Sequence, residues 1–290
     1  MIASSVAQQS AKTKPAGYQM TINSKEFGMT LQYRRTISSI KMLLQQYNLP
    51  DSTIYWEAST KLVELEKWIE KTLPKAPGLY IDVVGQTHEG GPVTDMSYQA
   101  ELLSSQSLIK NILLSNKYTL IGSEGDGSRF VTSATVLSGR DSGLGYRQMA
   151  KIPETLTTDD IYSFYGTYGQ PRSAIPSLMF LPDGFDSKVT GIEDSTMYAL
   201  HGMVLTIPAF SKLNELMTTM RSYVAFFKMV EELSNEKDPT KKKAVIVIGS
   251  MHLRDFVWMA RSTGVNMDFY YTSSGDFFRK IATTGDSMME

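Results

Sequence analysis

Two of the three histidines follow a short apolar run at the same spacing. The pattern Gly-x-x-His ends once at His88 and once at His252, and a third apolar run is followed by Gly-Ser-Glu, which ends at Glu124. An imidazole can take up or release a proton near neutral pH, and a carboxylate beside it can orient the ring or stabilise its charge. The shared spacing predicts that His88, Glu124 and His252 lie in one site.

Several other polar residues near these positions could assist the chemistry or bind a substrate. An arginine could neutralise an oxyanion or a substrate carboxylate. The candidates for substrate binding are Gln86, Glu89, Asp126, Arg129, Arg140 and Arg147. Glu193 could be catalytic, but with Asp194 it also suits the acidic start of a helix. His201 is expected to be packed or exposed and not catalytic.

The apolar runs that precede these residues predict strands of a parallel sheet. Tyr80–Val84 and Tyr118–Ile121 enclose a helical pattern over 97–115, which is typical of a parallel βαβ unit. Ala244–Ile248 is apolar on both faces, as a central parallel strand should be. The carboxyl ends of such strands face a common crevice. We expect the glycine after each run to let the chain leave the sheet sharply.

The remaining patterns complete an α/β fold, a mostly parallel β-sheet flanked by helices. Helical periodicity covers 31–47, 60–72, 194–236 with an interruption at Pro208, and 254–262, and a last strand is expected over 266–272. Gly, Ser, Asp and Pro are frequent over 123–191, which predicts loops and short helices above the carboxyl edge. The expected organisation is a flexible arm over 1–25 and a single domain over 26–290, with an insertion at about 125–192.

Composition excludes several classes of protein and partner. The 29 Lys and Arg against 30 Asp and Glu leave a net charge of −1, which gives no reason to expect a nucleic-acid partner. No apolar run approaches the roughly 20 residues of a membrane span. The chain has no cysteine, so thiolate metal sites and thiol nucleophiles are excluded. The first residues lack the apolar segment of a secretory signal but could remain from a processed precursor, so cytoplasmic and exported locations both stay open.

The chain also lacks the motifs of the common hydrolases and nucleotide-binding enzymes. It has no Gly-x-Ser-x-Gly elbow, no His-Glu-x-x-His and no Gly-x-x-x-x-Gly-Lys-Ser/Thr loop. The glycines around Asp126 fail the dinucleotide pattern because Phe130 stands where its last glycine should be. Serine esterases, zincins, NTPases and Rossmann dehydrogenases are therefore not expected.

Four short motifs together resemble the Tiki/TraB-like superfamily, which includes erythromycin esterases and ChaN-like haem-binding lipoproteins. In order they are Gly85-Gln-Thr-His88, Ile121-Gly-Ser-Glu-Gly125, Gly191-Ile-Glu-Asp-Ser-Thr-Met-Tyr198 and Val247-Ile-Gly-Ser-Met-His252. The resemblance covers about 78–272 and implies that both histidines and Glu124 share one pocket. In many members the first motif reads Gly-Glu-x-His, with a glutamate at the position of Gln86 in this chain. If that glutamate acts in the family, its role here would fall to Glu89 or Glu193. For the arginine of the family the nearest match is Arg147.

The resemblance and the residues together imply a hydrolase of an ester or amide bond in a small molecule or peptide. His88 would be the general base, Glu124 would orient it or the attacking water, and His252 would stabilise the oxyanion or protonate the leaving group. In a metal-dependent version, His88, Glu124 and His252 would bind a divalent ion and leave one position open for water. The alternative is a ligand-binding protein without catalysis, with haem held by the two histidines.

Overall fold

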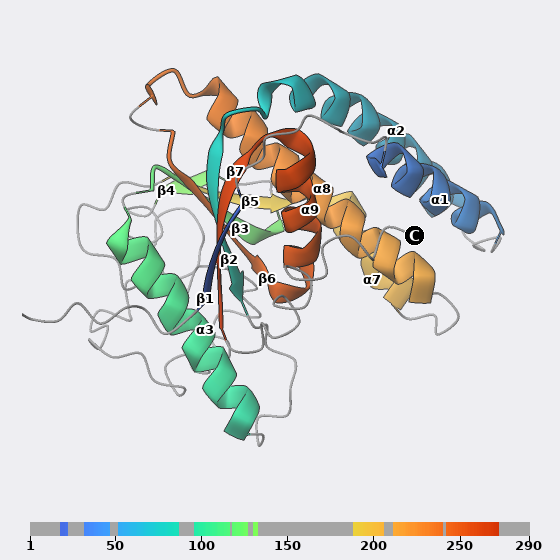
Figure 1. Ribbon diagram of the computed structural model, residues 1–290. Helices are drawn as coiled ribbons and strands as arrows, with labels where there is room; N and C mark the ends of the chain where they lie inside the picture. The colour runs from blue at the N-terminus through green and yellow to red at the C-terminus, as the bar shows by residue number, and fades with distance from the viewer. Residues whose placement is uncertain are drawn as a thin grey trace, which may run out of the picture.

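The described part of the protein folds around one sheet of seven strands. The computed structural model describes residues 18–22, 32–46, 52–86, 96–116, 118–126, 130–132, 188–205, 211–239 and 242–272. The strands are β1 (Tyr18–Ile22), β2 (Tyr80–Gln86), β3 (Leu120–Asp126), β4 (Phe130–Thr132), β5 (Lys188–Glu193), β6 (Ala244–Gly249) and β7 (Asn266–Tyr271). Their order is β1-β7-β2-β6-β3-β5-β4 (Figure 1). The five inner strands are parallel and both edge strands are antiparallel, so the predicted α/β fold is confirmed.

The late strand β6 lies between the two strands of the predicted βαβ unit. It pairs with β2 on one side and with β3 on the other. All six of its residues are buried, which explains why it is apolar on both faces. Gln86 lies opposite Gly249, and Ser123 opposite Val247. The carboxyl ends of β2, β6 and β3 are therefore neighbours, as the repeated strand-end pattern predicted.

Helices cover both faces of the sheet. They are α1 (Gln32–Gln46), α2 (Ser52–Thr72), α3 (Met96–Ser115), α7 (Ser195–Leu205), α8 (Ser211–Asn235) and α9 (Leu253–Thr263), with short 3-10 turns η1 (Leu73–Lys75) and η5 (Ser250–His252). Figure 1 shows α3 on one side of the sheet and α8 and α9 on the other. The two buried apolar clusters match these layers, since α3 packs on Val84 and Val247 while α8 and α9 pack on Ile246 and Phe269.

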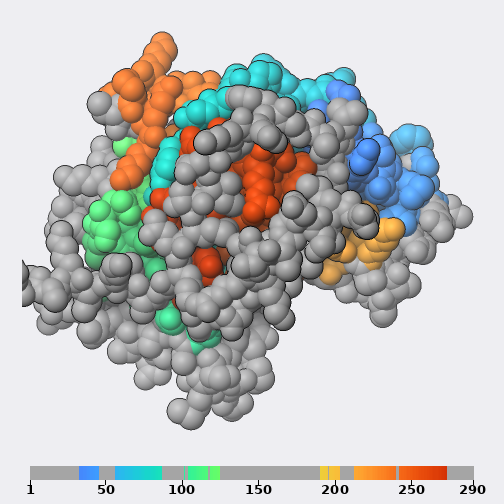
Figure 2. Space-filling model, in the orientation of Figure 1, coloured from blue at the N-terminus to red at the C-terminus, as the bar shows by residue number. Residues whose placement is uncertain are grey.

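The helices α1, α2 and α7 form an outer layer over α8. Each contacts α8, and α1 also contacts α2. Figure 2 shows α1 and α2 together at the surface, in blue and cyan. Because α8 is covered by both the sheet and the outer layer, its residues 220–227 are all buried, and Phe226 and Phe227 are fully buried. No helix within the described ranges is long and apolar enough to cross a bilayer.

Three segments differ from the sequence-based expectation. Tyr18–Ile22 lies in the expected flexible arm but forms β1, which pairs with β7. The strands β4 and β5 lie where only loops and short helices were expected, and β5 pairs with β3. The helix α2 begins at Ser52, earlier than the pattern over 60–72 indicated. All three strands are short or lie at or next to an edge of the sheet, where the hydrophobic pattern is weak.

The expectation that a glycine ends each strand is wrong for two of the three. Gly85 lies inside β2 and Gly122 inside β3, and neither has a positive φ. Their role is close packing: a Cβ atom on Gly85 would lie 2.4 Å from Leu253 Cδ1, and one on Gly122 would lie 2.6 Å from Met229 Sδ. Only Gly249 is the last residue of its strand, directly before η5.

Candidate functional site

Glu124 is a buried carboxylate near the carboxyl end of β3. Its side chain is 3% exposed. Its Oε2 accepts a hydrogen bond of 2.6 Å from the main-chain N–H of Gly249, at the end of β6. Its Oε1 accepts one of 3.0 Å from Arg221 Nη2. Two independent elements, a neighbouring strand and α8, therefore hold the carboxylate in one orientation.

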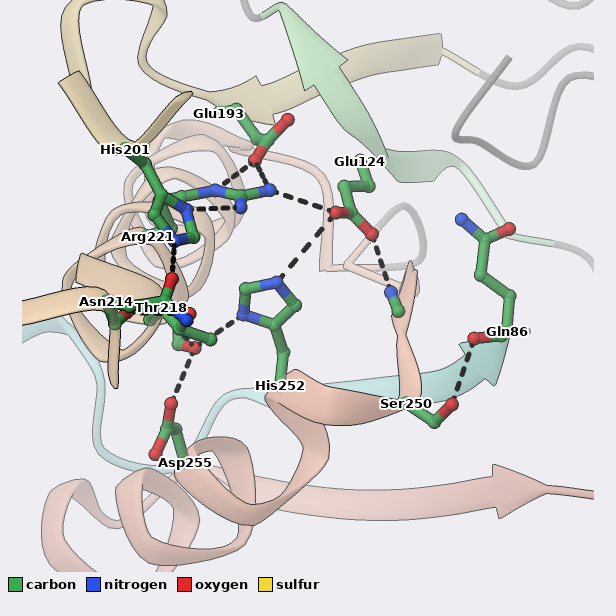
Figure 3. A network of polar contacts seen from close by, with 12 residues as sticks. Gln86, Glu124, Glu193, His201, Asn214, Thr218, Arg221, Ser250, His252 and Asp255 are labelled. Atoms are coloured by element: carbon green, nitrogen blue, oxygen red, sulfur yellow. Dashed lines mark hydrogen bonds and ion pairs between the residues drawn. The ribbon is translucent and has the colours of Figure 1, made fainter. Parts of the chain in front are cut away.

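His252 approaches the same carboxylate from the turn after β6. It is the last residue of η5 and is 4% exposed. Its Nε2 lies 3.8 Å from Glu124 Oε1 (Figure 3). That separation is too long for a hydrogen bond, but each atom could hydrogen-bond to the same water or substrate oxygen at about 2.8 Å. The predicted convergence of Glu124 and His252, which are far apart in the sequence, is therefore seen.

Arg221 on α8 links Glu124 to a second buried carboxylate, Glu193, at the end of β5. Its Nε donates a hydrogen bond of 2.6 Å to Glu193 Oε1, and its Nη2 makes ion pairs with both glutamates. The guanidinium also lies over the ring of Tyr198, with Cζ 5.3 Å from the centroid. A buried charge needs such partners, since desolvating it alone is costly. Glu193 and Glu124 thus meet at the same guanidinium nitrogen, Nη2 of Arg221 (Figure 3).

His201 orients Arg221 and is buried, which is one of the two environments expected for it. Arg221 Nη1 donates a hydrogen bond of 2.9 Å to His201 Nδ1. Because a guanidinium has only donors, Nδ1 must be the unprotonated nitrogen. The proton is then on Nε2, which donates to Asn214 Oδ1. His201 is neutral in this arrangement and supports the arginine.

The other ring nitrogen of His252 faces a polar group on α8. Ser222 Oγ lies 2.8 Å from His252 Nδ1 and 2.8 Å from Asp255 Oδ2. Burial raises the pKa of the Asp255 carboxyl, while the hydrogen bond from Ser222 and the charge of Arg254 act in the opposite direction. His252 therefore has a carboxylate near each of its nitrogens, one across a gap and one through a hydroxyl.

The remaining predicted residues divide into those that the structure describes and those that it does not. The main-chain oxygen of Gln86 accepts a hydrogen bond of 3.1 Å from Ser250 Oγ, which ties the end of β2 to η5. Asp126 is the last residue of β3, and its side chain is outside the described part. Asp194, and not Glu193, caps α7, because its Oδ1 accepts hydrogen bonds from the N–H groups of Thr196 and Met197. His88, Glu89, Arg129, Arg140 and Arg147 lie outside the described residues.

Sequence reasoning missed Arg221, Ser222 and Asp255. Arg221 and Ser222 are adjacent polar residues that directly precede the largely apolar stretch Tyr223–Val230, which is a detectable signal of a buried polar contact. Asp255 follows His252 by three residues, a spacing that brings side chains together on one side of a helical turn. Neither signal indicates that α8, which carries Arg221 and Ser222, meets the start of α9 near His252.

The charges around Glu124 bear on the metal-dependent version. Two of the three expected ligands, Glu124 and His252, lie together, and the described residues contain no group of three metal-binding side chains. Both oxygens of Glu124 already accept hydrogen bonds, one of them from a guanidinium. A divalent cation at Oε1 would lie beside that positive charge, which would oppose its binding there.

Comparison of the chain with protein-family models, with curated proteins and with solved structures found no match.

Proposed function

We propose that the protein hydrolyses an ester or amide bond at the carboxyl edge of the sheet, with His252 and Glu124 as central groups. The observation that carries this proposal is the buried pair of His252 Nε2 and Glu124 Oε1, 3.8 Å apart. An imidazole beside a fixed carboxylate is suited to proton transfer at neutral pH. The order of the Gly-x-x-His and Gly-x-Glu motifs, which resembles the Tiki/TraB-like superfamily, supports the same activity.

In the proposed mechanism each group has one step. A water molecule in contact with His252 Nε2 gives its proton to that nitrogen while its oxygen attacks the substrate carbonyl carbon. Glu124 stabilises the imidazolium that forms, since Arg221 and Gly249 hold its carboxylate in place. When the tetrahedral intermediate collapses, Nε2 returns the proton to the leaving alcohol or amine. His88, which the sequence predicted as the general base, lies outside the described residues, and in this mechanism it would instead polarise the carbonyl oxygen.

The haem-binding alternative gains no support from the position of His252. An axial ligand would have to direct a ring nitrogen at the iron. Here Nδ1 faces Ser222, and Nε2 faces Glu124, which is itself tied to Arg221. This arrangement suits a group that exchanges protons better than one that ligates a cofactor.

The test is hydrolysis of a panel of aryl esters, lactones and peptide amides by the wild-type protein and matched variants. Glu124→Gln and His252→Asn are each expected to lower kcat/KM by about 10²- to 10⁴-fold. Glu231→Gln is the control, because Glu231 also accepts a side-chain hydrogen bond, from Trp68 Nε1 at 2.8 Å, but lies away from the site. No hydrolysis by the wild type, or equal rates in wild type and Glu124→Gln, would exclude the proposal. Assays with and without a chelator separate the two versions, and the metal-free version requires equal rates.

A further inference from the structure

A single hydroxyl connects His252 to a buried carboxylate that the proposed chemistry does not use. Ser222 Oγ lies 2.8 Å from His252 Nδ1, 2.8 Å from Asp255 Oδ2 and 3.0 Å from the main-chain oxygen of Thr218. Ser222, His252 and Asp255 are all buried. In Figure 3, Asp255 and His252 lie on either side of this link, and Glu124 lies beyond the opposite nitrogen of the ring.

The hydroxyl has one proton for three neighbouring acceptors. A carboxylate is the strongest of them, since hydrogen bonds to a charged acceptor are roughly twice as strong as those between neutral groups. When Ser222 donates to Asp255, its oxygen can only accept from the ring. His252 must then carry its proton on Nδ1. The neutral ring is left with an unprotonated Nε2, which is the nitrogen that faces Glu124.

We infer that Asp255, acting through Ser222, is a positioning residue that fixes His252 in the Nδ1–H tautomer and directs the lone pair of Nε2 into the site. The use of that lone pair as a general base rests on the proposed function. The tautomer itself does not, because it follows from the three hydrogen-bonding groups alone.

Burial favours the neutral form of Asp255, and the groups around its carboxylate act against this effect. Arg254 Nε lies 3.6 Å from Oδ1, the oxygen that does not contact Ser222. Tyr223 and Thr219 on α8 also lie near the carboxylate, and the side-chain hydrogen bond of Thr219 favours its ionised form. The only cation among these neighbours is Arg254. It favours the ionised form.

Replacing the carboxylate by an amide should reverse the direction of the chain of hydrogen bonds. In Asp255→Asn, the amide oxygen pairs with Arg254 and the NH₂ group points to Ser222. The NH₂ group then donates to Ser222, whose proton turns to His252 Nδ1. The ring proton moves to Nε2, which can no longer accept a proton. In Ser-His-Asp enzymes the equivalent change keeps the geometry and lowers kcat by about 10⁴-fold because the tautomer is wrong.

The test is ¹⁵N NMR of protein labelled at histidine, at a pH above the titration of the rings. The chain has only three histidines, so His252→Gln identifies the signals of His252 by their loss. In the wild type we expect protonated Nδ1 and unprotonated Nε2, and in Asp255→Asn the reverse. Ser222→Ala should give a mixture of the two tautomers. Ser262→Ala and Asp82→Asn, which change another buried helix serine and another buried aspartate, should match the wild type.

Two results would overturn the inference: wild-type His252 with its proton on Nε2, or an Asp255→Asn protein that is folded and keeps the wild-type tautomer. The wild-type spectrum alone decides the matter if the variants do not fold. If the tautomer reverses as expected but the wild type hydrolyses nothing, the inference holds and the proposed function fails. If hydrolysis is found, Asp255→Asn should lower kcat by at least 10²-fold with KM nearly unchanged.

Discussion

Replacing Arg221 by methionine should destabilise the protein far more than replacing an exposed arginine with similar partners. Arg221 is 8% exposed and is the guanidinium shared by Glu124 and Glu193, each 3% exposed. Methionine keeps much of the length and apolar volume of the side chain but removes the charge and all five N–H donors. Two carboxylates would then be buried close together without their cation.

The expected loss follows from the cost of an uncompensated buried charge. Breaking a buried ion pair by removing one partner costs about 3–5 kcal/mol. The total free energy of unfolding of a natural domain is about 5–15 kcal/mol, so Arg221→Met should remove a large share of it. Adding Glu193→Gln to Arg221→Met should recover part of the loss, because one of the two stranded charges is then gone.

The chain contains a matched control for this experiment. Arg34 also lies between two glutamates, Glu66 and Glu70, but its side chain is 44% exposed. Exposed pairs of this kind contribute about 0–1 kcal/mol, so Arg34→Met should be nearly neutral. Urea unfolding, followed by the fluorescence of the three tryptophans, gives the free energy of unfolding of each variant. If Arg221→Met lowers the free energy of unfolding no more than Arg34→Met does, the ion pairs of Arg221 with Glu124 and Glu193 do not stabilise the fold.

Two further changes test the close packing at Gly122 and the burial of Asp82 on β2. Gly122→Ala should lower the free energy of unfolding by about 1–3 kcal/mol, because the new methyl group would lie 2.6 Å from Met229 Sδ and 2.8 Å from Ile192 Cγ2. Gly202→Ala is the control and should be neutral or stabilising, because a Cβ atom there would have no atom within 4 Å. Equal free energies of unfolding of the two variants, measured in urea, would contradict this. Burial raises the pKa of the Asp82 carboxyl, so the contribution of Asp82 to stability should be greatest where it is protonated and should be lost as pH rises through its folded pKa. Asp82→Asn should therefore be more stable than the wild type at pH 7 and lose that advantage near pH 4, as measured by urea unfolding at both values.

The sheet and half of the candidate site could be predicted because they depend on local patterns. The run Ala244–Ile248 is apolar at every position, which only a strand buried on both faces requires. A residue that follows such a strand closely lies at the carboxyl edge, so Glu124 and His252 could be placed there from their spacing alone. The contact between them needed only the rule that parallel strands share this edge.

The partners of these two residues could not be predicted, because they depend on how helices pack. The register of α8 against the sheet decides that Arg221 reaches Glu124 and that Ser222 reaches His252. Periodicity gives the buried face of a helix but not its axial position. The same limit explains the error at Gly122, where the need for a glycine comes from Met229 on α8 and not from the strand itself.

The position of β6 also affects how the protein can be made. Its neighbours β2 and β3 are complete by Asp126, but the strand that separates them begins only at Ala244. During synthesis, β2 and β3 therefore cannot pair with β6 until more than a hundred further residues have been added to the chain. Pairings between such distant segments slow folding, and unpaired strand edges promote aggregation in the interval. A binding partner or chaperone that covers these edges would raise the yield of folded protein.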